Sequence, residues 1–184
     1  MRVLRLSSQF SVTPQLDVVC HFTRAQVQWR IMDIIGKLSS LGWTLPQPPK
    51  PIAAYVPCVR IGDLLYISGQ LPWRDGKLLA VGKVCSSVAI ELAQTAAAQC
   101  AVHALSVAGG ELAGDFDRFV RVVRVGVFVQ SDDNFHDQAK IANGASELLA
   151  QVLGDAGRHA RAAVGVNALP LNAAVEVEFL FQVR

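Results

Sequence analysis

The most constraining feature of this sequence is a regular alternation of apolar and polar residues close to its C-terminal end. In VEVEFLFQV (175–183), every second residue from Val175 to Phe181 is a valine or a phenylalanine. Glu176 and Glu178 fall between them. A period of two is that of a β-strand, because successive side chains point to opposite faces of a sheet. We therefore predict a strand with one apolar face and two carboxylates on the other.

The residues just before this strand indicate a second one that begins with an arginine. In RHARAAVGVNALP (158–170), Arg161 opens a run of small and branched apolar residues, and a turn that contains Pro170 follows. We expect the two strands to form a ribbon that closes the chain. An arginine and a carboxylate on such an apolar ribbon need a chemical explanation.

Three more strands are predicted upstream. FVRVVRVGVFVQ (119–130) has few polar interruptions, which indicates a position in the middle of a sheet. Residues 53–62 and 63–72 read as two strands around a turn at Gly62-Asp63. A second turn is expected at Asp75-Gly76.

Three helices are predicted from periodicity. Residues 87–108 form an alanine-rich helix suited to close packing on a sheet, which Gly109-Gly110 should end. Residues 134–154 form a second helix with apolar residues at helical spacing. MDIIGKLSSLGW (32–43) forms a shorter one that stops at Gly42.

The order of these elements argues for an α+β fold, with a mixed sheet and both long helices packed on one face. The other face then has no helix to cover it. A sheet this apolar cannot leave a whole face in water, so we expect self-association. The pattern predicts an oligomer but not the number of copies.

Composition narrows the class of protein. The chain has 184 residues, of which 52% are hydrophobic and 17% charged, enough for one domain with a substantial core. The net charge of +2 argues against nucleic-acid binding. Four scattered cysteines favour reduced thiols in the cytoplasm over a disulfide framework or a zinc site. No apolar run is long enough to span a membrane.

Residues 1–31 differ from the rest of the chain. They are arginine-rich, with a single acid, Asp17, and they faintly resemble an organelle transit peptide. A structured extension, or an original start at Met32, would explain them equally simply. We favour the last, because Met32 opens a segment that reads as a native helix. We therefore expect a dispensable extension over 1–31 and one domain over 32–184.

From about residue 45 onward the chain resembles the RidA (reactive intermediate deaminase) family, also called YjgF or liver perchloric-acid-soluble protein. The matching pieces, in order, are AYVPCVRIGDLLYISGQLP, VRVVRVGVFVQSDDNF, IANGASELL and ARAAVGVNALPLNAAVEVE. The resemblance implies a chorismate-mutase-like fold, a barrel-like homotrimer and sites in clefts between subunits. Competent members hydrolyse imines and enamines released by pyridoxal-phosphate enzymes to 2-keto acids and ammonia, without cofactor or metal.

The resemblance assigns roles to Arg161 and Glu176. Arg161 falls on the substrate-binding arginine of the family, and a guanidinium binds a carboxylate through two parallel hydrogen bonds. Glu176 falls on the acidic residue that positions or activates the attacking water. A partly buried carboxylate can carry the required proton if its pKa is raised. The same residues could instead be an arginine that extends to water and a solvent-facing glutamate.

Four other positions match the substrate-binding residues of the family. Tyr55 offers a hydroxyl, Ser68 a hydroxyl at a strand end, and Gly69 a backbone N–H with room for close approach. Asn143 lies inside the second long helix, where asparagine is unfavourable, which favours a role beyond packing. Each of them has a purely structural alternative, as a rim aromatic, a strand serine or a surface asparagine.

The sequence also departs from the family. Many members have a cysteine where this chain has Ala163, and the archetype often has an acid where it has Gly165. The segment GDAGRHA (154–160) lengthens the region before Arg161 and is expected to reshape the cleft. The chain therefore resembles a divergent branch.

Three functions follow from these features. The first is hydrolytic deamination of 2-imino and 2-enamino acids, favoured because both Arg161 and Glu176 are present. The second is a non-catalytic module that binds a small carboxylate with the same arginine. The third, endoribonuclease or translation inhibitor, is disfavoured by the near-neutral charge and the absence of a histidine at the matched positions.

Overall fold

The computed structural model describes residues 33–48 and 55–184, so the predictions for 1–31 lie outside the described residues. In chain order the elements are α1 (Ile34–Ser40), β1 (Cys58–Ile61), β2 (Leu64–Gln70), β3 (Trp73–Arg74), β4 (Lys77–Leu78), α2 (Ile90–Glu111), η1 (Phe116–Arg118), β5 (Phe119–Gln130), α3 (Gln138–Leu153), η2 (Gly154–Gly157), β6 (Ala160–Val166), η3 (Pro170–Asn172) and β7 (Val175–Val183).

Five of the strands form one sheet in the order β1-β2-β7-β5-β6. β6 runs parallel to β5, and the other neighbours are antiparallel, which confirms the predicted mixed sheet. β3 and β4 form a separate hairpin around Asp75 and Gly76, both with positive φ, as a tight hairpin turn requires. The turn at Gly62 between β1 and β2 is confirmed in the same way.

The predicted ribbon of the last two strands is wrong, because β6 and β7 do not pair. β5 lies between them. α3 connects β5 to β6, and a helical crossover of this kind brings its two strands together in parallel. The connection 167–174 then carries the chain past β5, so that β7 pairs antiparallel on its other side.

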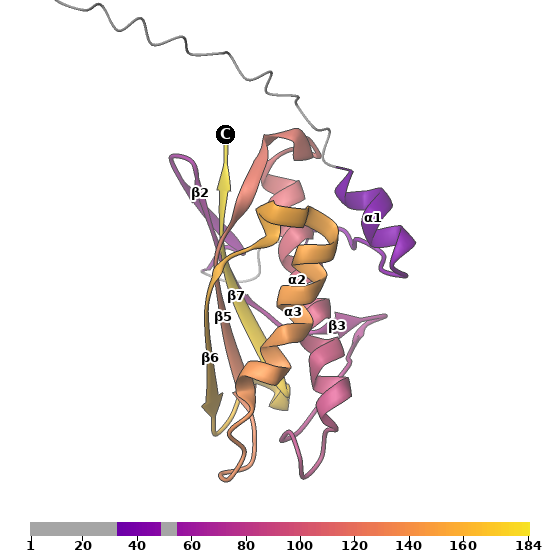
Figure 1. Ribbon diagram of the computed structural model, residues 1–184, viewed down its shortest axis with the longest axis vertical. Coiled ribbons are helices and arrows are strands. Elements are labelled where there is room, and N and C mark those ends of the chain that lie inside the picture. The colour runs from indigo at the N-terminus through magenta and orange to yellow at the C-terminus, as the bar shows by residue number, and fades with distance from the viewer. Residues whose placement is uncertain (1–32, 49–54) are drawn as a thin grey trace, which may run out of the picture.

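The helices α2 and α3 pack against each other and cover one face of the sheet, as predicted (Figure 1). α2 contacts β2 and β7, and α3 contacts β5 and β6. The apolar row of β7 from Val175 to Phe181 is buried beneath them, and its polar positions are half-buried on the other face. Full burial of a side chain such as Phe181 contributes roughly 1.5–3 kcal/mol, so this row is a main source of core stability.

The prediction that Gly109-Gly110 ends α2 is wrong, since the helix continues to Glu111. A Cβ at Gly109 would lie 2.8 Å from Phe116 Cζ, and one at Gly110 would lie 3.0 Å from Pro48 Cγ. The two glycines therefore serve close packing inside the helix and do not stop it.

The predicted starts of the long helices are also too early. α2 begins at Ile90 instead of Ser87, because a bridge between Val84 and Val88 keeps that segment extended. α3 begins at Gln138, after a turn closed by the N–H of Phe135 on the carbonyl of Asp132.

α1 begins where the side chain of Asp33 accepts a hydrogen bond of 2.8 Å from the N–H of Gly36. Gly42, with φ of +78°, follows its end, as predicted. Ile34 and Leu38 are buried, whereas Ile35 is exposed.

The second face of the sheet is not covered by any described helix. It carries Glu176 and Glu178, together with exposed apolar side chains from both ends of the sheet. These side chains are Val59, Ile61, Tyr66 and Val164, of which Ile61 is the most exposed at 62%. We refer to this surface as the open face.

Candidate functional site

The structure places the predicted site residues in two groups on opposite faces of the sheet. Arg161 pairs laterally with Val125, which pairs with Phe179 of the buried row, so the Arg161 side chain lies on the helix side. Glu176 pairs with Phe128 and points to the open face. One copy of the chain therefore does not bring the two residues together.

The first group, the Arg161 cluster, forms where β6 begins beside α3. Arg161 Nη1 donates hydrogen bonds to Asn143 Oδ1 at 2.9 Å and to Ser146 Oγ at 3.0 Å. The predicted pair Arg161 and Asn143 is thus in direct contact. Within the described residues, Arg161 Nε and Nη2 make no hydrogen bond, and the side chain is exposed. This edge of the guanidinium has the geometry to bind a carboxylate through two parallel bonds.

Ser146 and His159 complete this cluster and were not predicted. Ser146 Oγ lies 3.0 Å from His159 Nε2, and His159 Nδ1 lies 2.6 Å from the carbonyl oxygen of Gly157. Burial lowers the pKa of His159; the positive charge of Arg161 lowers it further, and the bond to Gly157 partly offsets this. Ser146 follows Asn143 by one helical turn, so helix periodicity was the signal that could have found it.

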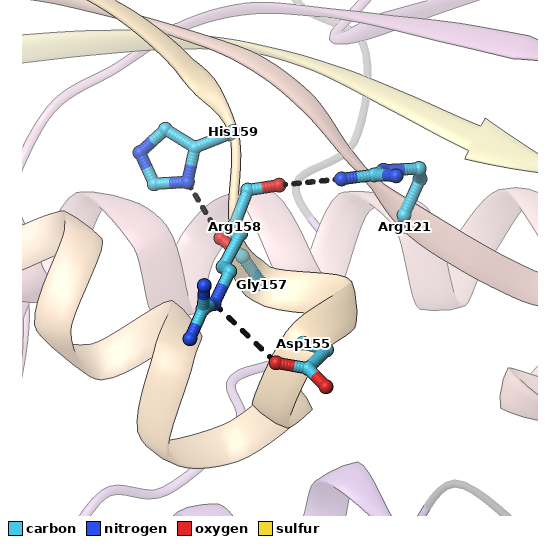
Figure 2. Close-up of polar contacts among 5 residues, drawn as sticks. All are labelled: Arg121, Asp155, Gly157, Arg158 and His159. Carbon is cyan, nitrogen blue, oxygen red and sulfur yellow. Dashed lines mark hydrogen bonds and ion pairs between the residues drawn. The ribbon is translucent and has the colours of Figure 1, made fainter.

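Figure 2 shows how the turn before β6 holds His159. Arg121 Nη2 donates to the carbonyl oxygen of Arg158 at 3.0 Å, and Arg158 Nε lies 3.3 Å from Asp155 Oδ1. His159 bonds to the carbonyl oxygen of Gly157 in the same turn. The segment 154–160, predicted to reshape the site, therefore supplies the histidine of the Arg161 cluster.

The second group, the Glu176 cluster, lies where β2 meets β7. The Glu176 carboxylate lies directly over Gly69, where a Cβ would come within 2.7 Å of Glu176 Cδ. The pairing of β2 with β7 shifts register between Ile67 and Gln70, which re-aims the backbone at this point. Burial raises the pKa of Glu176, and the neighbouring Glu178 raises it further. Such a carboxylate is suited to hold and release a proton near neutral pH.

Glu178 is a different kind of carboxylate. It lies on the same face but forms an ion pair with Arg124, with Nη1 and Oε1 2.7 Å apart. Its interpretation as a structural strand residue agrees with this ion pair.

Ser68 and Tyr55 lie at the same end of β2. The Ser68 hydroxyl donates to the carbonyl oxygen of Val56 at 3.0 Å, and the Ser68 N–H donates to that of Pro57. Ser68 thus ties the segment that carries Tyr55 to β2, next to Gly69. Tyr55 itself is 65% exposed.

The described part of the chain contains no group of three or more His, Cys, Asp or Glu residues that could hold a metal ion. In the same residues, no helix has the length and apolar character needed to cross a membrane.

Comparison with known proteins relates the chain to one family. The family model described as endoribonuclease L-PSP matches residues 46–183. Protein TCP17 of Trypanosoma cruzi is 42% identical over 152 residues, which are 82% of this chain and 94% of that protein. The 2-iminobutanoate/2-iminopropanoate deaminase of Dermatophagoides farinae is 30% identical over 133 residues, or 72% of this chain and 88% of that one.

Two solved structures are similar over nearly their whole length. A protein of unknown function from Agrobacterium tumefaciens has a TM-score of 0.78 and 45% identity, over 82% of this chain and 92% of that one. A crystal structure described as a putative endoribonuclease from Shewanella oneidensis has a TM-score of 0.77 and 25% identity, over 82% and 99%.

Proposed function

Because the chain belongs to the endoribonuclease L-PSP family, which includes the RidA and YjgF proteins, we propose that it is a hydrolytic deaminase of 2-imino acids. The observation that carries the proposal is the Arg161 guanidinium, held by α3 through Nη1 with its Nε and Nη2 edge left for a ligand. Similarity to a 2-iminobutanoate/2-iminopropanoate deaminase supports the choice of substrate class.

The chemistry needs two groups, and the chain has both. The substrate carboxylate binds the Nε and Nη2 edge of Arg161, which orients the C=N bond. Water adds to the imine carbon while Glu176 passes a proton from the water to nitrogen, which gives a tetrahedral carbinolamine. Collapse of this species expels ammonia and leaves the 2-keto acid. The raised pKa of Glu176 favours this exchange of protons.

The site requires more than one copy of the chain. Arg161 and Glu176 lie on opposite faces of the sheet, so a cleft that contains both must lie between copies. The exposed apolar side chains of the open face favour such an association. We propose a homotrimer whose open faces meet in a barrel-like interior. Light scattering should give about three times the 19.8 kDa chain mass, and a stable monomer would contradict the assembled site.

A second candidate is a non-catalytic module that binds small carboxylates. It is favoured if the assembly does not bring Glu176 to Arg161, since the Arg161 cluster could still hold a carboxylate. The module requires binding of pyruvate without imine hydrolysis, and no effect of Glu176→Gln on binding.

The endoribonuclease activity named in the family description is the least supported. The net charge of +2 provides no broad basic groove. Among the described residues no cluster of metal ligands is present for phosphate chemistry.

The test couples purified protein to threonine dehydratase and follows the released imine by trapping with semicarbazide. The protein should lower the amount of trapped imine, and Arg161→Ala should return it to background. Arg74, which stacks on Trp43 at 5.8 Å and belongs to neither cluster, is the matched control, and Arg74→Ala should act like the wild type. Equal trapping with and without the wild-type protein would rule out the deaminase.

A further inference from the structure

We infer that Ser146 and His159 are positioning residues for Arg161, which orient its guanidinium so that the Nε and Nη2 edge, and not Nη1, meets the substrate carboxylate. This inference rests on the proposed function of Arg161. It assigns a role to two side chains that are specific to this chain's own α3 and β6.

The first step is the count of protons on Nη1. A guanidinium nitrogen of this kind carries two N–H groups. Asn143 Oδ1 accepts one at 2.9 Å, and Ser146 Oγ accepts the other at 3.0 Å. Nη1 is therefore saturated by α3, and a carboxylate has to bind at the opposite edge.

The second step is the direction of the bonds behind Ser146. The carbonyl oxygen of Gly157 can only accept, so His159 Nδ1, at 2.6 Å, must carry a proton. In a neutral ring Nε2 is then an acceptor, and at 3.0 Å it takes the proton of the Ser146 hydroxyl. Ser146 Oγ is thereby left with its lone pairs toward Arg161. The chain of donors runs without conflict from Arg161 through Ser146 to His159.

The other two states of the ring do not fit as well. If Nε2 alone carried the proton, two lone pairs would meet between Nδ1 and the carbonyl oxygen of Gly157. If both nitrogens carried protons, Ser146 would lose its acceptor, and a second positive charge would lie beside Arg161 in a half-buried place. The arrangement therefore favours one neutral tautomer, with the proton on Nδ1.

The third step is the rigidity of this support. The turn that presents His159 is held by Arg121 on the carbonyl oxygen of Arg158 and by the pair of Arg158 with Asp155 (Figure 2). Ser146 lies within α3, which is packed on the sheet. A long flexible arginine thus has one orientation before the ligand arrives, which lowers the entropy lost on binding.

The test measures binding of pyruvate by calorimetry and turnover in the coupled imine assay. Ser146→Ala removes one bond to a charged group, so Kd for pyruvate and KM should rise roughly tenfold, while kcat falls much less. Ser146→Thr keeps the hydroxyl and should restore most of the affinity. His159→Leu should behave like Ser146→Ala. His159→Gln keeps an acceptor near the position of Nε2 and should bind more tightly than His159→Leu.

A spectroscopic signature is independent of activity. Nitrogen-15 NMR of the wild-type protein should report His159 as the neutral tautomer with the proton on Nδ1, and this signature should weaken in Ser146→Ala. Thermal unfolding of each variant shows whether the fold is kept, and Ser146→Thr retains the test if the alanine variant does not fold.

The results separate the two proposals. If Arg161→Ala binds pyruvate as tightly as the wild type, the proposed function fails and this inference falls with it. If Arg161→Ala abolishes binding but Ser146→Ala and His159→Leu bind like the wild type, only the positioning role is overturned. A His159 tautomer with the proton on Nε2 would overturn it as well.

Discussion

Gly69→Ala is the substitution that examines the Glu176 cluster with the least disturbance to the fold. Gly69 has no positive φ, so alanine fits its backbone conformation. The new Cβ, however, would lie 2.7 Å from Glu176 Cδ and closer still to Oε1. Carbon atoms in contact prefer about 3.5–4.0 Å, so the carboxylate has to move by on the order of 1 Å.

The expected effect on turnover is large and the effect on stability small. A displacement of about 1 Å in a catalytic group can cost roughly 10²-fold in rate, and loss of a general acid–base group costs a similar factor. Because the obstructing atoms belong to the flexible end of a glutamate, rotation of that side chain should cost only about 0.5–1.5 kcal/mol of the free energy of unfolding.

The control is the same substitution one carboxylate away. A Cβ at Gly126 would lie 2.6 Å from Oε1 of Glu178, which is ion-paired and has no assigned role in catalysis. Gly126→Ala should therefore have a comparable effect on stability and keep most of the activity. The coupled imine assay and urea unfolding measure both quantities. If Gly69→Ala retains wild-type turnover, or if Gly126→Ala loses as much, Glu176 is not the proton-transfer group.

Three further substitutions test other parts of the argument. Arg161→Lys replaces a forked guanidinium by a single ammonium that cannot bond to α3 and a carboxylate together, so kcat/KM should fall about 10- to 100-fold in the coupled assay. Glu176 has a raised pKa in the folded state, so its protonated form supports folding below the unfolded pKa, and that support is lost as pH rises through the folded pKa. Urea unfolding should accordingly show Glu176→Gln level with the wild type under acid conditions and more stable at neutral pH; the opposite trend would show that the carboxylate is not penalised by burial. Gly109→Ala should destabilise the protein by about 1–3 kcal/mol, because its Cβ would meet Phe116, and an unchanged unfolding midpoint would contradict the packing role of this glycine.

Local pattern alone predicted several elements well. The strand over 119–130 has the predicted bounds, and the alternation over 175–183 correctly divided buried from half-buried side chains. The turns at Gly62 and at Asp75-Gly76 also lie where expected. These features depend on the chemistry of neighbouring residues, since periodicity and positive φ are properties of a few positions along one strand or turn.

The resemblance, carried by motifs in the sequence, selected Arg161 and Asn143, which the structure brings into hydrogen-bonding contact. It did not indicate Ser146 or His159. Their roles depend on how closely the turn before β6 approaches α3, which no spacing in the sequence records.

Only the tertiary structure decided which segments lie side by side. The last two strands read as a ribbon, yet β5 separates them, because the crossover through α3 makes β6 its parallel neighbour. Gly109 and Gly110 read as a helix end, yet Phe116 and Pro48 pack where their side chains would be. For the same reason Arg161 and Glu176, matched to one site by the sequence, lie on opposite faces of the sheet. The direction of a side chain follows from its strand, but the group it meets depends on which distant element, or which second copy of the chain, packs against that face.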